Sequence, residues 1–179
     1  AFVRILRDAA SPALPEAGIM YDALVAAGVR PAPFLAFFQV ESRCGNVGIC
    51  KEFDTRNPGN VRTPEVAGAA TAVLDTPRGR FAQYPTWANG TRDWAARMRG
   101  PKYAGRGLRT VRQVLPVYAP AADGNAPEAY ITSVLTSVAG WVKEGGMAQL
   151  TGRVDLLSAG AVNNPDRLMW DGKPRSITI

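Results

Sequence analysis

The segment from Phe34 to Ser42 constrains the fold more than any other part of the sequence, because it is apolar almost all round a helix. Pro31 and Pro33 stand before it, and a glycine-containing loop that begins at Cys44 follows it. A helix that is apolar on every side is typical of the centre of a domain. The chain has 179 residues, 46% of them hydrophobic, which is enough for one core around such a helix. We therefore predict a single domain built around this segment.

One carboxylate, that of Glu41, lies on this apolar segment. Glu41 comes seven residues after Phe34 and three after Phe38, so the three side chains lie near one face of the helix. If that face lines a cleft, partial burial and the negative end of the helix dipole both raise the pKa of the carboxyl. A general acid that works near neutral pH needs such a pKa. The alternative is an ordinary solvent-exposed glutamate at a helix end.

The remaining pattern predicts a mainly α structure of the α+β class, with a helical lobe around the buried helix and a small β-hairpin lobe. Residues 71–74 and 80–84 flank a turn-rich stretch, 75–79, and suit a hairpin. Residues 51–66 are polar and turn-rich, which predicts a surface loop. Apolar periodicity and terminal signals predict further helices, over residues 16–28, 87–99, 108–117 and 126–143.

The sequence pattern predicts regular structure clearly up to residue 144 and only weakly after it. We assign residues 1–144 to the domain and residues 145–179 to a C-terminal extension, whose weak periodicity and polar tail predict only partial order. No apolar run approaches the length that a bilayer-spanning helix needs, so we expect no transmembrane segment. We also expect a monomer.

The two cysteines, Cys44 and Cys50, bracket a short loop that contains two glycines. Glycine permits the tight turn of a small disulfide ring, so we predict a disulfide, which persists only in an oxidising compartment. Two free thiols are the alternative. The chain has no histidine, which disfavours a structural zinc site or a zinc amidase and excludes a Ser-His-Asp hydrolase. We expect no metal and no cofactor.

The charge of the chain points to anionic partners. It has 21 basic and 15 acidic residues, a formal charge of +6, and such a field attracts anions over a distance. The basic residues are scattered and form no recognisable nucleic-acid-binding motif, so nucleic acid is not the expected partner. Anionic cell-wall and membrane surfaces remain as the candidate partners.

Several short motifs follow one another between residues 17 and 142. They are Phe34 to Ser42, Asn57 to Arg62, Arg80 to Trp87, Tyr103–Ala104, Tyr118 to Pro120 and Asp123 to Asn125. In this order and spacing they resemble the landmarks of bacterial and phage endo-β-N-acetylglucosaminidases, which are peptidoglycan hydrolases of the lysozyme-like superfamily. Each motif alone is short, and the resemblance depends on their combination.

This resemblance implies a lysozyme-like α domain with a small β lobe and a cleft between them. Glu41 stands at the position of the family's proton donor, and Ser42 belongs to the same motif. The segment that contains Asn57 and Asn60 is similar to the loop that lines the family's cleft, which makes both asparagines candidates for binding substrate. Tyr103 matches a tyrosine that is often found near the donor.

Glycoside hydrolysis usually requires a second carboxylate, either as nucleophile or as base for water. Asp54, Glu65 and Asp75 all lie in the presumed β-lobe region, and Asp75 and Glu65 are our first candidates, ahead of Asp54. Asp75 could equally be an ordinary turn aspartate. Substrate-assisted routes need no second carboxylate at all. Tyr84 is a further candidate for substrate binding, because an aromatic ring can stack on a sugar.

The sequence thus predicts an enzyme that cleaves the glycan strand of peptidoglycan at N-acetylglucosaminyl β-1,4 linkages, with Glu41 as general acid. The expected partners are peptidoglycan glycan strands and the anionic cell-wall surface. The expected location is extracellular or in the cell wall, after secretion or delivery by a phage. The alternatives are a lytic transglycosylase, which forms an anhydro sugar, and an inactive wall-binding or phage structural domain.

Overall fold

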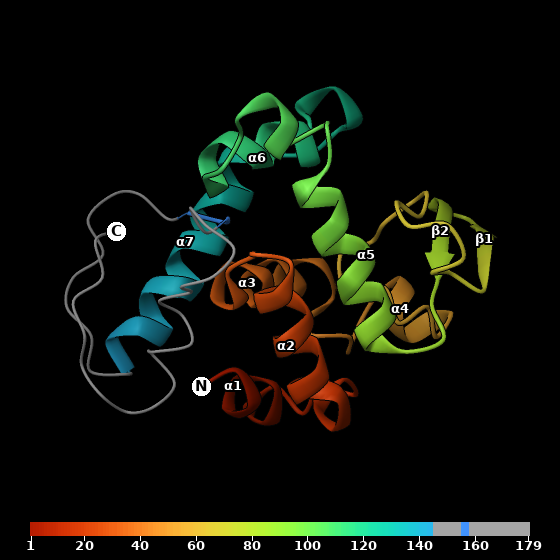
Figure 1. The fold of residues 1–179 in the computed structure, drawn as a ribbon, viewed down its shortest axis with the longest axis horizontal. Coiled ribbons are helices and arrows are strands. Elements are labelled where there is room, and N and C mark those ends of the chain that lie inside the picture. The colour runs from red at the N-terminus through yellow and green to blue at the C-terminus, as the bar shows by residue number, and fades with distance from the viewer. Residues whose placement is uncertain (145–154, 158–179) are drawn as a thin grey trace.

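Helix α3 (Pro31–Ser42) runs through the middle of the computed structural model, which describes residues 1–144 and 155–157 (Figure 1). Pro31 occupies the first turn, where its missing N–H costs no hydrogen bond. The helix ends at Arg43, whose φ of 48° is left-handed and whose N–H donates to the carbonyl of Gln39 at 2.8 Å. The apolar segment is therefore the central helix, as predicted, although it begins at Pro31 rather than Phe34.

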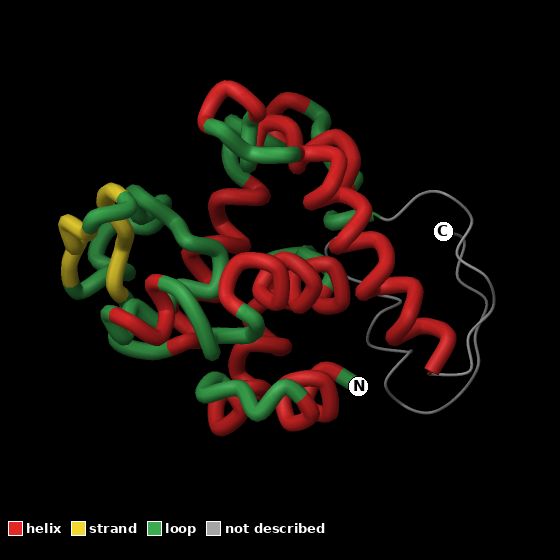
Figure 2. Tube along the Cα trace, turned by 180° about the vertical axis from the view of Figure 1, so that it is seen from behind, coloured by secondary structure: helices red, strands yellow, loops and turns green. Residues whose placement is uncertain are grey.

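Helices α1, α2, α5 and α7 pack against α3 (Figures 1 and 2). Helix α7 packs against both α3 and α6, and α2 packs against α5. None of the described helices is long and apolar enough to cross a bilayer. These helices are α1 (Phe2–Asp8), α2 (Ala17–Ala26), α4 (Ile49–Glu52), α5 (Trp87–Arg99), α6 (Val111–Tyr118) and α7 (Pro127–Glu144), with short 3-10 turns η1 (Leu14–Glu16), η2 (Ala104–Arg106) and η3 (Ala121–Asp123).

The predicted helices α2, α5, α6 and α7 are confirmed, with ends that shift by a few residues. Two short helices were not predicted. Helix α1 has only two turns, which is too short for its apolar periodicity to be recognised in the sequence. Its inner face is nevertheless buried, through Phe2 and Leu6. Helix α4 takes the first residues of the predicted loop at 51–66 because Cys50 and Ile49 pack into the interior.

Aromatic side chains from α3 and α5 form the middle of the core. The ring centroids of Phe34 and Phe37 lie 5.2 Å and 5.4 Å from that of Trp94, in edge-to-face geometry. Phe38 lies 5.4 Å from Trp87. Burying a side chain of this size contributes roughly 1.5–3 kcal/mol, and each aromatic pair adds about 1 kcal/mol. The contacts fix α5 against the central helix.

The β lobe is one antiparallel hairpin, β1 (Ala72–Thr76) and β2 (Gly79–Gln83), at the edge of the molecule farthest from α7 (Figure 1). The predicted hairpin is confirmed, but the strands run closer to the turn than the sequence indicated. Gly79 has a φ of 105°, which suits glycine at this tight turn. The described residues therefore form an α+β structure, as predicted.

Two carboxylates fasten α5 to the rest of the chain. Asp93, fully buried in α5, accepts hydrogen bonds from the N–H groups of Glu65 and Val66 at 2.8 and 2.7 Å and from the hydroxyl of Tyr84 at 2.7 Å. Glu16 accepts from the first backbone N–H groups of α5, 2.9 Å from that of Ala88. A carboxylate at this helix end also interacts favourably with the positive end of the helix dipole.

Part of the predicted C-terminal extension packs into the domain. Residues 155–157 lie between the α2–α3 connection and the start of α6, where the N–H of Arg30 donates to the carbonyl of Leu156 at 2.9 Å. Leu156 and Leu157 are buried in the core. The rest of the predicted extension, residues 145–154 and 158–179, lies outside the described residues.

We expect Asp93→Ala to lower the free energy of unfolding by about 3 kcal/mol, because it removes the acceptor of three hydrogen bonds and leaves the buried hydroxyl of Tyr84 without a partner. Urea titration followed by circular dichroism measures the change. Asp75→Ala is the matched control, since the Asp75 side chain is 85% exposed and its loss should change stability by no more than about 0.5 kcal/mol. Equal effects of the two substitutions would contradict the role given to Asp93.

Candidate active site

Glu41 lies in the last turn of α3, with its carboxyl turned away from the aromatic core toward a pocket. The Asn60 side-chain amide donates to one carboxyl oxygen (Nδ2 to Oε2, 2.6 Å). The Tyr130 hydroxyl, from α7, donates to the other (Oη to Oε1, 2.5 Å). Each oxygen thus has a donor from a different segment of the chain, and the carboxyl is held in one orientation.

The pKa of Glu41 reflects two opposing effects. Burial raises the pKa, because the charged form loses hydration, while the hydrogen bonds from Tyr130 and Asn60 lower it by favouring the carboxylate. Burial is the larger effect, so the pKa lies above its ordinary value. Glu41 therefore keeps a transferable proton at higher pH than a carboxyl in water does.

The loop from Asn57 to Val61 carries Asn60 to this position. The Asn57 side chain accepts a hydrogen bond from the N–H of Val61 at 2.8 Å and donates to the carbonyls of Val61 and Ala82, at 2.8 and 2.9 Å. These bonds close the loop and join it to β2. Asn60 itself has a left-handed φ of 48°, a conformation that asparagine tolerates better than most residues. Asn57 holds the loop that carries Asn60 and does not itself line the pocket.

Gly59 allows the same loop to lie directly against α5 and α6. A Cβ at this position would fall 2.1 Å from Cδ1 of Trp94 and 2.9 Å from the hydroxyl of Tyr118, so a larger residue would displace the loop. The Tyr118 hydroxyl donates to the Gly59 carbonyl and accepts from the Trp94 indole N–H at 3.2 Å. The position of Asn60 therefore depends on the packing of the preceding residue, Gly59.

A pocket of about 550 Å³ opens beside Glu41, between the helical part and the segment that leads to the hairpin. Tyr103, Tyr118 and Tyr130 form part of its wall, and burial raises the pKa of all three hydroxyls, so they stay neutral donors and acceptors. Its lining residues are Val40, Glu41, Gly59, Asn60, Val61, Arg62, Thr63, Phe81, Arg97, Lys102, Tyr103, Val117, Tyr118, Ala119, Pro120, Asp123, Asn125 and Tyr130.

Of the predicted site residues, Glu41, Asn60 and Tyr103 line this pocket, whereas Ser42 and Tyr84 do not. The buried Ser42 hydroxyl donates to the Phe38 carbonyl at 3.3 Å and accepts from the Gly45 N–H at 2.9 Å, so it shapes the end of α3. The Tyr84 hydroxyl is used by Asp93, and its ring is buried in the core. The side chains of Ser42 and Tyr84 therefore stabilise the fold and do not contact the pocket.

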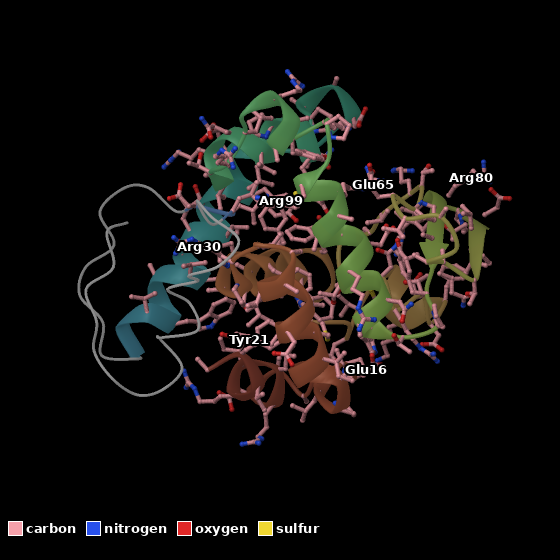
Figure 3. All side chains as sticks on the ribbon, viewed as in Figure 1. Glu16, Tyr21, Arg30, Glu65, Arg80 and Arg99 are labelled. Carbon is pink, nitrogen blue, oxygen red and sulfur yellow. The ribbon has the colours of Figure 1, made fainter. Side chains whose placement is uncertain are left out.

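The structure also separates the predicted second carboxylates from Glu41. Asp75 pairs with Arg80 at 3.3 Å on the exposed outer side of the hairpin, where Figure 3 shows Arg80 pointing outward. Glu65 lies beside α5 and pairs with Arg97 at 3.8 Å (Figure 3). Asp54 pairs with a neighbouring arginine at 2.8 Å. None of the three lines the pocket.

Three residues that line the pocket, Asp123, Asn125 and Tyr130, were not predicted as site residues. In the sequence, the run from Asp123 to Asn125 predicts a cap for the following helix and forms part of the family resemblance, but neither residue is a predicted site residue. In the structure Asp123 ends η3 at the pocket wall, and Asn125 precedes α7. The run lies directly before the helix that carries Tyr130, and this is the signal that could have found them. The tyrosine in contact with Glu41 is thus Tyr130 rather than the predicted Tyr103.

The predicted Cys44–Cys50 disulfide is absent, and this prediction was wrong for the structure described: both cysteines are buried free thiols. Their surroundings differ. The Cys50 thiol donates to the carbonyl of Asn57 at 3.1 Å, at the start of the loop that carries Asn60, whereas Cys44 borders a second hollow near α1 and α7. Glycine spacing permits a small ring, but the short helix α4 turns Cys50 inward, where it helps to hold Asn57.

Within residues 1–144 and 155–157, no group of three or more His, Cys, Asp or Glu side chains is arranged to hold a metal ion. Glu41 and Asp123 are the carboxylates among the described residues that line the pocket.

Comparison of the chain with protein-family models, with curated proteins and with solved structures found no match. The resemblance to wall glucosaminidases consequently depends on the sequence motifs alone.

We expect neither cysteine of the native protein to react with iodoacetamide, because both are buried and burial raises the pKa of Cys44 to about 12 and that of Cys50 as well. Both should be alkylated after unfolding in guanidinium without reductant. Intact-mass spectrometry counts the added groups. An unfolded protein that takes up no label until it is reduced would show that the two sulfurs are bonded.

Proposed function

We propose that this protein is a peptidoglycan-cleaving glycosidase of lysozyme-like fold, with Glu41 as the general acid. One observation carries the proposal: a carboxyl with a raised pKa, held on both oxygens, faces a pocket large enough for a sugar residue. The motifs that resemble wall glucosaminidases support the choice of substrate, an N-acetylglucosaminyl β-1,4 linkage.

In the proposed reaction, protonated Glu41 donates its proton to the glycosidic oxygen as the bond from that oxygen to C1 breaks. Water then adds to C1 and loses a proton to a carboxylate. Asp123 is our candidate for this base, because it is the other carboxylate among the described residues of the pocket wall. Tyr130 and Asn60 stabilise the carboxylate that Glu41 becomes, since both donate to it.

The arrangement of the two lobes agrees with this proposal. The donor lies on the central helix of the helical lobe, and the segment from Asn60 to Thr63 that faces it leads toward the β-hairpin. Such a division, with a helix-end glutamate facing a small β lobe, is what the resemblance to lysozyme-like enzymes implies. The proposed substrate lies outside the cytoplasmic membrane, so we propose action at the cell wall, where the charge of +6 favours anionic polymers.

We expect Glu41→Gln to abolish clearing of purified peptidoglycan. The substitution keeps nearly the same shape but removes the proton that reaches the leaving oxygen, and a placed general acid contributes ~10²–10⁴-fold to the rate. Turbidity of a wall suspension measures the loss. Near-normal clearing by the variant would remove Glu41 from the mechanism. A wild-type protein that binds the wall but never clears it would instead support the inactive wall-binding alternative.

Thermal unfolding at several pH values is the control for this variant. The native pKa of Glu41 is raised, so wild type loses stability as pH rises from the unfolded pKa, near 4.5, through the native value. Glutamine carries no such penalty. We therefore expect the variant to melt at or above the wild-type temperature at neutral pH, with the difference shrinking as the pH falls toward 4. A collapsed melting temperature would mean that lost clearing reflects unfolding.

The alternative of a lytic transglycosylase is favoured by one feature, the exposed position of Asp123 at the edge of the pocket. Internal attack by a sugar hydroxyl requires no base for water. We expect hydrolysis, so the released muropeptides should carry a free reducing end, and Asp123→Asn should slow release by at least about tenfold. Mass spectrometry of the products decides: anhydro ends, together with full activity of the Asp123 variant, would establish the transglycosylase. Asp22→Asn, on α2 and outside the pocket, is the matched control.

A further inference from the structure

Three basic side chains line the same pocket as Glu41: those of Arg62, Arg97 and Lys102. Arg62 follows the loop that carries Asn60, Arg97 lies in the last turns of α5, and Lys102 lies just after α5. Arg97 and Lys102 come from around the end of α5 and Arg62 from a distant segment, and the fold brings all three to the same pocket. Proton donation by Glu41 to an uncharged sugar requires none of them.

Aromatic rings hold two of these cations in place. The guanidinium carbon of Arg62 lies 4.9 Å from the centroid of Phe81, and the Lys102 ammonium lies 5.8 Å from that of Tyr103. Arg62 also lies against the backbone of Gly79, since a Cβ there would fall 2.4 Å from its Nη1. The rings orient the two side chains and leave their N–H donors for other groups.

The charges in the pocket do not balance. Arg97 pairs with Glu65 at 3.8 Å and donates to the Thr63 carbonyl, but neither Arg62 nor Lys102 forms an ion pair with any carboxylate of the described residues. On the acidic side the pocket offers Asp123 and the carboxyl of Glu41, which is held toward its neutral form. A concave surface with unneutralised cations concentrates anions.

We propose that Arg62 and Lys102 form a subsite for an anionic substituent of the glycan, a carboxylate or a phosphate. This inference rests on the proposed function and specifies its substrate. A guanidinium offers two parallel N–H donors that match either anion, and a nearby ammonium adds a point charge. Glycan residues that bear a lactyl ether or a peptide carry carboxylates, and wall polymers attached to the glycan carry phosphates. The pocket thus selects charged wall glycan over an uncharged N-acetylglucosamine polymer.

The test compares two tetrasaccharides of equal length, one uncharged and built of N-acetylglucosamine, the other with alternating residues that bear a free lactyl carboxylate. Calorimetric titration of the Glu41→Gln protein measures both affinities without turnover. We expect tighter binding of the charged tetrasaccharide. Arg62→Gln and Lys102→Gln, each added to Glu41→Gln, should reduce this preference by roughly tenfold, the size of one charge-assisted hydrogen bond.

Arg99→Gln is the matched control, because Arg99 is exposed at the end of α5 (Figure 3), does not line the pocket and carries the same charge. It should leave the preference intact. No preference for the charged tetrasaccharide, or an equal loss on Arg99→Gln, would overturn the inference while leaving the glycosidase proposal standing.

Inorganic phosphate and acetate, used as competitors, distinguish the two sources of the anion. Displacement of the charged tetrasaccharide mainly by phosphate identifies a phosphate subsite, and displacement mainly by acetate identifies a carboxylate subsite. If neither tetrasaccharide binds or is cleaved, the proposed function fails. NMR titration with phosphate or acetate alone then decides the subsite: shifts of the Arg62 and Lys102 side-chain signals support it, and their absence overturns it.

Discussion

A carboxyl group on a buried helix loses the water that would solvate it, and the protein must supply donors in its place. Asn60 and Tyr130 do this for Glu41, and much of the architecture serves to bring these two donors together. The amide of Asn57 shapes the loop that carries Asn60, while the packing of α7 against α3 places Tyr130. Two donors do not replace bulk water in full, so the carboxyl remains easier to protonate than one in solution.

The chain uses its other inward-facing carboxylates differently. Glu16 and Asp93 both accept hydrogen bonds from backbone N–H groups, and each joins α5 to a segment distant in sequence. The two oxygens of Glu41 receive their short hydrogen bonds from side chains, on the wall of a pocket. A carboxylate bound by backbone amides fastens the fold, whereas one bound by side chains beside open space can exchange its proton with a ligand. The basic residues Arg62, Arg97 and Lys102 line the same pocket.

Local patterns were sufficient to predict the central helix, the longer helices around it and the hairpin, because burial and turn formation leave direct marks on short stretches of sequence. They were also sufficient to single out Glu41, since a carboxylate on an apolar helix is conspicuous. The partners of that carboxylate were beyond such reasoning. Tyr130 lies 89 residues from Glu41, and only the packing of α7 on α3 relates them. Likewise, glycine spacing indicated a ring between Cys44 and Cys50, but the inward turn of α4 decides where Cys50 points.

Because Tyr130 lies on α7, the last described helix, the surroundings of Glu41 are completed only after α7 has been synthesised. A nascent chain that has left the ribosome only as far as α6 already contains Glu41, Asn60 and the whole hairpin, but one oxygen of the carboxyl still lacks its donor. The packing of α7 against α3 is also missing until α7 docks. The surroundings of the Glu41 carboxyl are therefore completed late in synthesis, and a chain released or cut before α7 carries Glu41 without the hydrogen bond from Tyr130.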